Sequence, residues 1–326
     1  YFISIKAKRI ACVVSAVIFV ATSCVSPLTG FAFWETNLAY EGESIYNYLQ
    51  VKNLSDRTIL STNVLFGVQS VTMKDKGLTG MYYDTALAAP ALADNANSAL
   101  ILGMGTGTYA RQLKQYYPKM NITGVEIDQK ITDLAGEYFD EPADIPVTTY
   151  DGRAWLAASH DKYDVIMVDA YQDITIPFQL SSVEFFTEVQ RHLKPGGVMV
   201  VNLNMTSRED GSINQYLCDT MASVFAYTYL ADVPGNTNTE VFCTNAPGLP
   251  ERFAASRAAL TDGDYAAMMA EVAADLTAYT GGDHILTDDK APVEVLGMRV
   301  LDELIAGELD YYRENFSLQE ILGMLG

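Results

Sequence analysis

The chain contains the stretch Ala99-Leu-Ile-Leu-Gly103-Met-Gly105-Thr-Gly107, in which a run of apolar residues leads straight into three alternating glycines. The residues that follow, 108–117, have the spacing of an amphipathic helix. Glycines let the backbone of such a turn approach a ligand closely, and the free N–H groups of the helix start face that ligand. Thr108 stands where the dinucleotide fingerprint has Gly or Ala, so the turn does not favour NAD.

After this turn, apolar strands alternate with amphipathic helices along the chain, as in a parallel sheet covered by helices. We expect strands at 99–102, 122–126, 146–149, 164–168 and 198–203, and an edge hairpin of 227–231 and 240–244. Helices are expected at 108–117, 129–139, 153–159, 183–193 and 212–225, and the Ala-rich chain beyond Leu249 reads as helical to its end. Ahead of the turn, the short β-rich runs 43–53, 57–63 and 68–73 predict a small antiparallel sheet.

An acidic residue, Glu126, ends the strand after the glycine turn, and Asp128 follows it. A carboxylate at this position accepts hydrogen bonds from the two hydroxyls of a ribose, so the turn and Glu126 together predict a nucleoside site. The alternative is structural: a glycine turn followed by an acid that caps a helix.

Two more acids follow strands at the same predicted rim. Asp151 precedes Gly152 and is placed either to accept from an adenine amino group or to cap the next helix. Asp169 emerges from the apolar strand 164–168, where a carboxylate can hold an amine by charge and take its proton. Asp173 is placed to bind a second positive group further out.

Composition limits the classes of partner. Hydrophobic residues make up 49% of the chain and charged residues 19%, the balance of a globular protein. The formal charge of −20 repels phosphate backbones, which argues against nucleic acid and favours cationic metabolites, unless the acidic surface serves only solubility. The three histidines share no metal-ligand spacing and the four cysteines form no framework, so we expect no metal site.

The N-terminal segment is apolar. No charge interrupts Ile10–Val25, Lys6, Lys8 and Arg9 precede this run, and Trp34 follows it. The pattern predicts a membrane helix, with a signal peptide as the alternative.

Several motifs together resemble one family. They are VEID at 125–128, YDGR at 150–153, YDVIMVDAYQD at 163–173, ILTDDKAPVE at 285–294 and MYYDTAL at 81–87. With the glycine turn, they resemble the polyamine aminopropyltransferases, the spermidine synthase family, and most of all its bacterial branch with membrane helices. The resemblance implies an α/β fold with a Rossmann-like, class I methyltransferase-type sheet. The expected segments are a membrane helix or signal anchor (1–40), a small β-domain (41–83), a nucleoside-binding catalytic domain (84–298) and a helical tail (299–326).

The resemblance also implies residue roles. Gly103, Gly105 and Glu126 would hold the methionine and ribose parts of decarboxylated S-adenosylmethionine, Asp151 would hold adenine, and Asp169 would orient and deprotonate the attacking amine. Further positions expected to contact the nucleoside or the amine are Gly107, Gly152, Asn47, Tyr83 and Asp84. Asn47 stands where the family has a Gln that touches the nucleoside, and Tyr83 and Asp84 fall near its amine-binding Tyr.

Two positions depart from the family pattern. Thr106 replaces the Asp of the glycine loop, and the segment from Asp169 to Asp173 has one extra residue before its second acid and no Pro after it. Two alternatives therefore stay open: a methyltransferase that uses ordinary S-adenosylmethionine, and a weakly catalytic membrane-tethered sensor of nucleoside or polyamine. The expected partners are a polyamine substrate, the membrane and a second copy of the chain that pairs through the N-terminal sheet. A single span with its cations in the cytoplasm would put the catalytic domain outside, away from the donor pool, yet we expect that domain in the cytoplasm.

Overall fold

The computed structural model describes residues 6–23, 32, 35–63, 67–140, 142, 144–170, 176–204, 210–261 and 263–298. Its strands form two sheets, one of four strands in the order β1-β2-β3-β4 and one of eight in the order β12-β10-β11-β9-β8-β5-β6-β7. The strands of the large sheet are β5 (Ser98–Leu102), β6 (Asn121–Glu126), β7 (Val147–Thr149), β8 (Tyr163–Val168), β9 (Leu193–Leu203), β10 (Tyr227–Asp232), β11 (Thr239–Thr244) and β12 (Thr277–Tyr279).

The predicted α/β fold is confirmed, with a parallel core of β7, β6, β5, β8 and β9 and an antiparallel edge of β11, β10 and β12. From β5 the chain moves outward to β6 and β7 and then returns to the other side of β5 as β8. This reversal of strand order opens a crevice at the carboxyl ends of β5 and β8, where open α/β sheets bind ligands.

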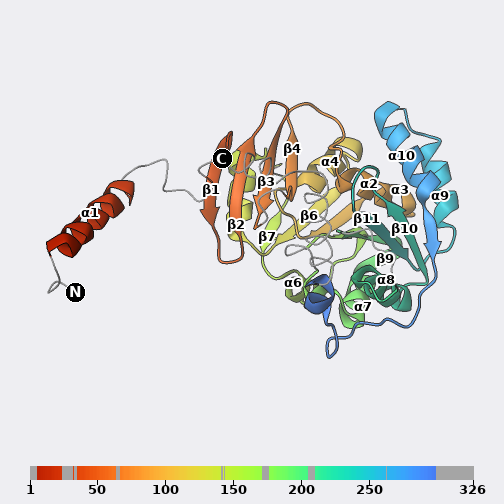
Figure 1. Cartoon of the computed structure of the whole chain (residues 1–326). Helices are drawn as coiled ribbons and strands as arrows, with labels where there is room; N and C mark the ends of the chain where they lie inside the picture. Colours follow the sequence, from red (N-terminus) through yellow and green to blue (C-terminus); the bar gives the residue numbers. More distant parts are fainter. Residues whose placement is uncertain are drawn as a thin grey trace, which may run out of the picture.

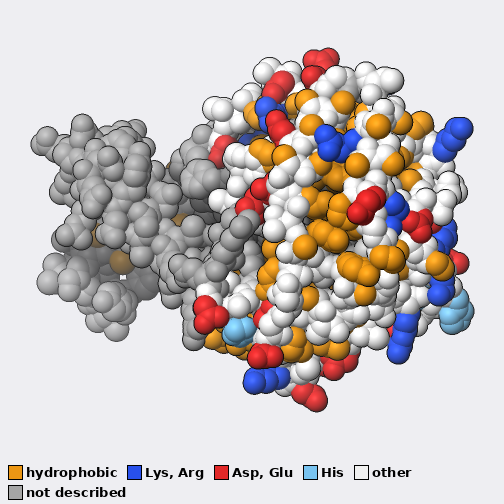
Figure 2. Space-filling view, turned by 90° about the vertical axis from the view of Figure 1, so that its right-hand side faces the viewer, with side chains coloured by type: hydrophobic (Ala, Val, Ile, Leu, Met, Phe, Trp, Pro, Cys, Tyr) orange, Lys and Arg blue, Asp and Glu red, His pale blue; other side chains and the backbone are white. Residues whose placement is uncertain are grey.

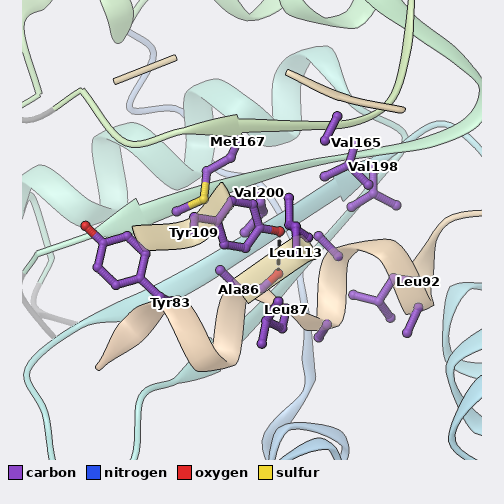
Figure 3. Close-up of a cluster of buried hydrophobic side chains, with 14 of the residues drawn as sticks. Tyr83, Ala86, Leu87, Leu92, Tyr109, Leu113, Val165, Met167, Val198 and Val200 are labelled. Atoms are coloured by element: carbon purple, nitrogen blue, oxygen red, sulfur yellow. Dashed lines mark hydrogen bonds between the residues drawn. The ribbon is translucent and has the colours of Figure 1, made fainter. Parts of the chain in front are cut away.

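Helices cover both faces of the large sheet (Figure 1). Alternate residues of each central strand point to opposite faces, so Val165 and Met167 contact α2–α4 while Ile166 and Val168 contact α6–α8. The helices of this layer arrangement are α2 (Tyr82–Ala86), α3 (Ala88–Leu92), α4 (Thr108–Tyr116), α6 (Gly152–Ala158), α7 (Val183–His192) and α8 (Ile213–Val224). Figure 3 shows the first of the two buried layers, in which the Tyr109 hydroxyl donates to the carbonyl oxygen of Ala86 and so ties α4 to α2.

The small sheet consists of β1 (Leu38–Glu43), β2 (Tyr48–Asn53), β3 (Arg57–Thr62) and β4 (Ser70–Met73), paired antiparallel as predicted. Its apolar face packs on α5 (Gln129–Tyr138), where Leu49 and Leu60 meet Leu134. Thr108 Oγ1 donates to the carbonyl oxygen of Val71 and accepts from its N–H, which fastens β4 to the first residue of α4. The small sheet therefore stands beside the glycine turn.

Two parts of the fold differ from expectation. The N-terminal run forms helix α1 (Lys6–Ser23), but no helix in the described part of the chain is long and apolar enough to cross a membrane. Residues 24–31, into which the apolar run continues, lie outside the described residues. The expected membrane anchor therefore stays a prediction.

The chain beyond Leu249 is also not helical throughout. After α9 (Leu249–Arg257) and α10 (Gly263–Asp275), residues 277–279 add strand β12 to the edge of the sheet by pairing with β10. The Ala-rich composition alone did not predict this three-residue strand.

Figure 2 shows the side of the molecule that carries α9 and α10. Apolar side chains gather in the middle of that view, between separate charged groups.

Candidate active site

A cavity of about 870 Å³ opens at the carboxyl ends of the parallel strands, between the large and the small sheet. The predicted positions that line it are Asn47, Tyr83, Gly103, Gly105, Glu126, Asp151, Gly152 and Asp169. The strand topology therefore brings glycines and acids from β5, β6, β7 and β8 to one site.

The glycine turn is shaped by what surrounds it. Gly103 has a φ of +88°, and a Cβ added there would lie 2.3 Å from the carbonyl oxygen of Asp169. Gly105 has a φ of +55°, and its Cβ would meet Ser70 Oγ of the small sheet at 2.8 Å. Residues other than glycine rarely adopt a positive φ, and an added Cβ would clash with its neighbours. Glycine is therefore required at both positions by backbone conformation and by the lack of space. The turn can thus pass close to Asp169 on one side and to β4 on the other.

Glu126 is the last residue of β6 and is buried. Its Oε2 accepts from the backbone N–H of Gly105 at 2.8 Å, and its Oε1 accepts from that of Asp128 at 3.0 Å. Burial raises the pKa of Glu126, while these two hydrogen bonds lower it. The carboxylate is therefore held rigidly against the glycine turn at the cavity wall.

Asp128 joins the two sheets. Its Oδ1 accepts from the N–H of Lys130 and caps α5, and its Oδ2 accepts from Ser44 Oγ at 2.5 Å and from Asn47 Nδ2 at 3.2 Å. Asn47 also accepts from Asn63 Nδ2. Asn47 thus lies at the cavity, and its side chain is positioned by Asp128 and Asn63.

Asp151 caps α6, because its Oδ1 accepts from the N–H of Ala154 at 2.8 Å. Asp151 therefore caps a helix, which was the alternative interpretation, and it lines the cavity as well.

Arg153 fixes another part of the cavity wall. It donates to both carboxylate oxygens of Asp288, at 2.8 and 2.6 Å, and to the carbonyl oxygen of Gln179. This clamp fixes the segment around Gln179, which forms part of the cavity wall.

Asp169 follows β8 directly and is half-buried where it lines the cavity. Tyr82 donates its hydroxyl to Oδ2 at 2.8 Å, and Asn202 donates Nδ2 to Oδ1 at 3.3 Å. Burial raises the pKa of Asp169 to about 7, although both hydrogen bonds act to lower it. A carboxyl with this pKa takes and returns a proton near neutral pH, which is the property of a general base.

Tyr83 lines the cavity next to Tyr82: its hydroxyl donates to the carbonyl oxygen of Gln69 and also acts to lower the pKa of Asp169. Gly107, with a φ of +81°, precedes α4 without lining the cavity. The structure does not bring Asp84 to the cavity: its oxygens accept from Thr79 and Gly80. The physical reason is that an acid in the first turn of α2 binds the N–H groups ahead of that helix. Asp173 lies outside the described residues.

Sequence reasoning missed Tyr82 and Asn202. Tyr82 stands next to the predicted Tyr83; both hydroxyls act on the pKa of Asp169, and Tyr82 donates to its Oδ2. Asn202 is the polar residue that interrupts the apolar strand 198–203, and that interruption was a usable signal. The Oδ1 of Asn202 accepts from Asn238 Nδ2 at 2.8 Å, which fixes the orientation of the Asn202 amide toward Asp169.

In the part of the chain that the structure describes, no group of acids, histidines and cysteines is arranged to hold a metal ion.

Comparisons with known proteins agree with this geometry. The family model of the spermine/spermidine synthase domain matches residues 81–247. A probable polyamine aminopropyl transferase of Bifidobacterium longum is 73% identical, over 100% of this chain and 77% of that protein. A polyamine aminopropyltransferase of Vibrio vulnificus is 27% identical over 69% of this chain and 77% of its own length.

Solved structures share the fold. A probable spermidine synthase from Corynebacterium glutamicum has a TM-score of 0.56 at 20% identity and covers 76% of this chain and 98% of its own. A spermidine synthase in complex with the transition state analogue AdoDATO has a TM-score of 0.57 at 19% identity, covering 72% and 85%. With the family match and the 73% identical relative, these findings show that the chain belongs to the spermine/spermidine synthase family of polyamine aminopropyltransferases.

Proposed function

We propose that this transferase moves the aminopropyl group of decarboxylated S-adenosylmethionine to a primary amine of a polyamine, with Asp169 as the base. The observation that carries the proposal is the half-buried carboxyl of Asp169, with its pKa raised to about 7, in the cavity that Gly105 and Glu126 also line. The family membership supplies the class of reaction, and the position of Asp169 supplies the proton acceptor.

The donor would lie along the glycine turn. Its two ribose hydroxyls would donate to Glu126, and its adenine would lie beside Asp151 and Gly152. The positive charge of the sulfonium is lost as the carbon–sulfur bond breaks, so the chain's main task is to hold donor and amine in line and to exclude water. The half-buried position of Asp169 against the buried Tyr82 suits both tasks.

The acceptor amine is an ammonium ion in water and must lose a proton before its lone pair can attack. Asp169 takes that proton, the nitrogen–carbon bond forms, and the donor leaves as a neutral thioether nucleoside. Tyr82 and Asn202 hold the two oxygens of Asp169, which leaves the carboxylate in one orientation. General-base catalysis of this kind contributes about 10²–10⁴-fold to the rate.

Product analysis tests the proposal. The purified chain is incubated with putrescine and either decarboxylated or ordinary S-adenosylmethionine, and the amine products are identified by their masses in mass spectrometry. We expect an aminopropyl adduct together with methylthioadenosine from the decarboxylated donor. A methylated amine from the ordinary donor would identify a methyltransferase instead, and tight binding without any product would favour a sensor.

The rate should depend on pH through Asp169. The folded-state pKa is raised to about 7, so the carboxyl is protonated below that pH and cannot accept the proton of the amine. We expect kcat/KM for the amine to rise about tenfold per pH unit below about pH 7 and to level off above it, because kcat/KM reports the ionisation of the free enzyme. Stopped assays at low amine concentration across about pH 5.5–8.5 measure this dependence. A kcat/KM that stays flat across that range would argue against Asp169 as the base.

Glu126→Gln should weaken donor binding. The amide keeps an acceptor oxygen for the N–H of Gly105 but loses the charge that strengthens hydrogen bonds from the ribose hydroxyls. We expect the Kd of methylthioadenosine to rise about tenfold, which corresponds to about 1.4 kcal/mol. Calorimetry measures the change, and Glu137→Gln on α5, away from the cavity, is the matched control. Equal nucleoside affinity in the two variants would argue against ribose recognition by Glu126.

A further inference from the structure

Glu240, in strand β11 between β10 and β9, is fully buried, yet neither of its carboxylate oxygens has a hydrogen-bond partner among the described residues. A buried carboxyl without partners costs free energy, because it gives up its hydration and receives nothing in return. Buried polar groups in folded proteins are normally hydrogen-bonded, so each exception calls for a functional explanation.

The position of Glu240 points to the acceptor end of the active site. In the β9–β11 ladder Glu240 is the direct partner of Asn202, and opposite residues of an antiparallel pair have their side chains on the same face. Asn202 donates to Asp169 and accepts from Asn238, and both asparagines line the cavity. Glu240 therefore lies next to a residue that lines the cavity and bonds Asp169.

The electrostatic surroundings agree with this placement. Burial raises the pKa of Glu240 far above its usual range, and the charge of Asp169 raises it further. The hydroxyl-bearing rings nearby are Tyr109 of α4, whose pKa the charge of Glu240 raises, and Tyr82 of α2, which bonds Asp169. Two interacting carboxyls titrate together, and a positive charge nearby favours the ionisation of both.

We propose that Glu240 is a positioning residue of the acceptor site: behind Asp169 and Asn202, its carboxylate supplies the second negative charge against which a polycationic amine binds. The inference rests on the proposed function, since it takes the acceptor to be a polyamine. When the amine enters, its positive charge favours ionisation of both carboxyls, and the proton that they held passes to the solvent. Affinity for the acceptor is thereby coupled to its charge.

The test is equilibrium binding, which does not require turnover. Putrescine is titrated by calorimetry into the chain saturated with methylthioadenosine, in two buffers of different ionisation enthalpy. For Glu240→Gln, which keeps the side-chain size, we expect putrescine to bind about tenfold more weakly, with fewer protons released and unchanged nucleoside affinity. Glu240→Asp, which keeps the charge, should restore most of the affinity. Glu240→Met replaces the Gln variant if the latter is unstable.

Asp219→Asn is the matched control. Asp219 is also buried, but it accepts from Tyr279, Gly282 and His284 and does not line the cavity. This variant should lose stability and keep its putrescine affinity, whereas Glu240→Gln should keep its stability and lose affinity. Putrescine binding within about twofold of the parent chain in Glu240→Gln, or an equal loss of nucleoside and putrescine binding, would overturn the inference. If the parent chain binds putrescine through Glu240 but yields no aminopropyl product, the proposed function fails and this inference stands.

Discussion

Asp169→Asn should abolish aminopropyl transfer while leaving the nucleoside site intact. The amide occupies the same space and keeps an oxygen for the hydroxyl of Tyr82, but it cannot accept the proton of the attacking amine. We expect kcat to fall by about 10²–10⁴-fold, the contribution of a general base. Single-turnover assays with decarboxylated S-adenosylmethionine and putrescine measure the loss.

Methylthioadenosine binding is the control for this variant. Glu126, Gly105 and Asp151 are unchanged, so the nucleoside Kd should stay within about twofold of the parent value. Turnover at the parent rate would show that another group accepts the proton, and a parallel loss of nucleoside binding would show that Asp169 acts on the structure of the site.

Gly103→Ala should damage both folding and catalysis. The new Cβ would meet the backbone of Asp169 and Ala170, which cannot rotate away as a side chain would, and φ is +88° there. Overpacking costs about 1–3 kcal/mol and a left-handed alanine about 1–2 kcal/mol, so the free energy of unfolding should drop by about 2–5 kcal/mol. Urea denaturation measures this drop.

Catalysis in the folded Gly103→Ala protein should fall as well, because a displacement of about 1 Å in a catalytic group costs about 100-fold in rate. Gly211→Ala is the matched control: Gly211 also has a positive φ, +76°, but nothing lies within 4 Å of the added Cβ. That control separates backbone strain from the clash with Asp169. Equal stability and activity in the two variants would contradict the close approach of the glycine turn to β8.

Much of the fold was predictable because its signals are local. The apolar run 99–102 and the three glycines that follow specify a strand and a turn by composition alone, and Glu126, Asp151 and Asp169 could be placed at one rim because parallel strands share their direction. The resemblance added the family, which the comparisons confirm.

The parts that failed depend on contacts between distant residues. The hydrogen bond from Tyr82 to Asp169 depends on how α2 packs on the large sheet. The position of Glu240 beside Asn202 appears only when β11 pairs with β9. The three residues of β12 become a strand because β10 offers them a free edge. Pairing with a second copy of the chain, the cytoplasmic location of the catalytic domain and a role for Asp173 stay predictions.

The most direct measurement is a crystal structure of the chain with methylthioadenosine and putrescine bound together. We expect the ribose hydroxyls against Glu126, the adenine beside Asp151, and one amine of putrescine within hydrogen-bond distance of Asp169, all in the cavity at the carboxyl ends of β5 to β8. Nucleoside density away from the glycine turn, or an amine bound far from Asp169, would contradict a single active site built by the rims of these strands.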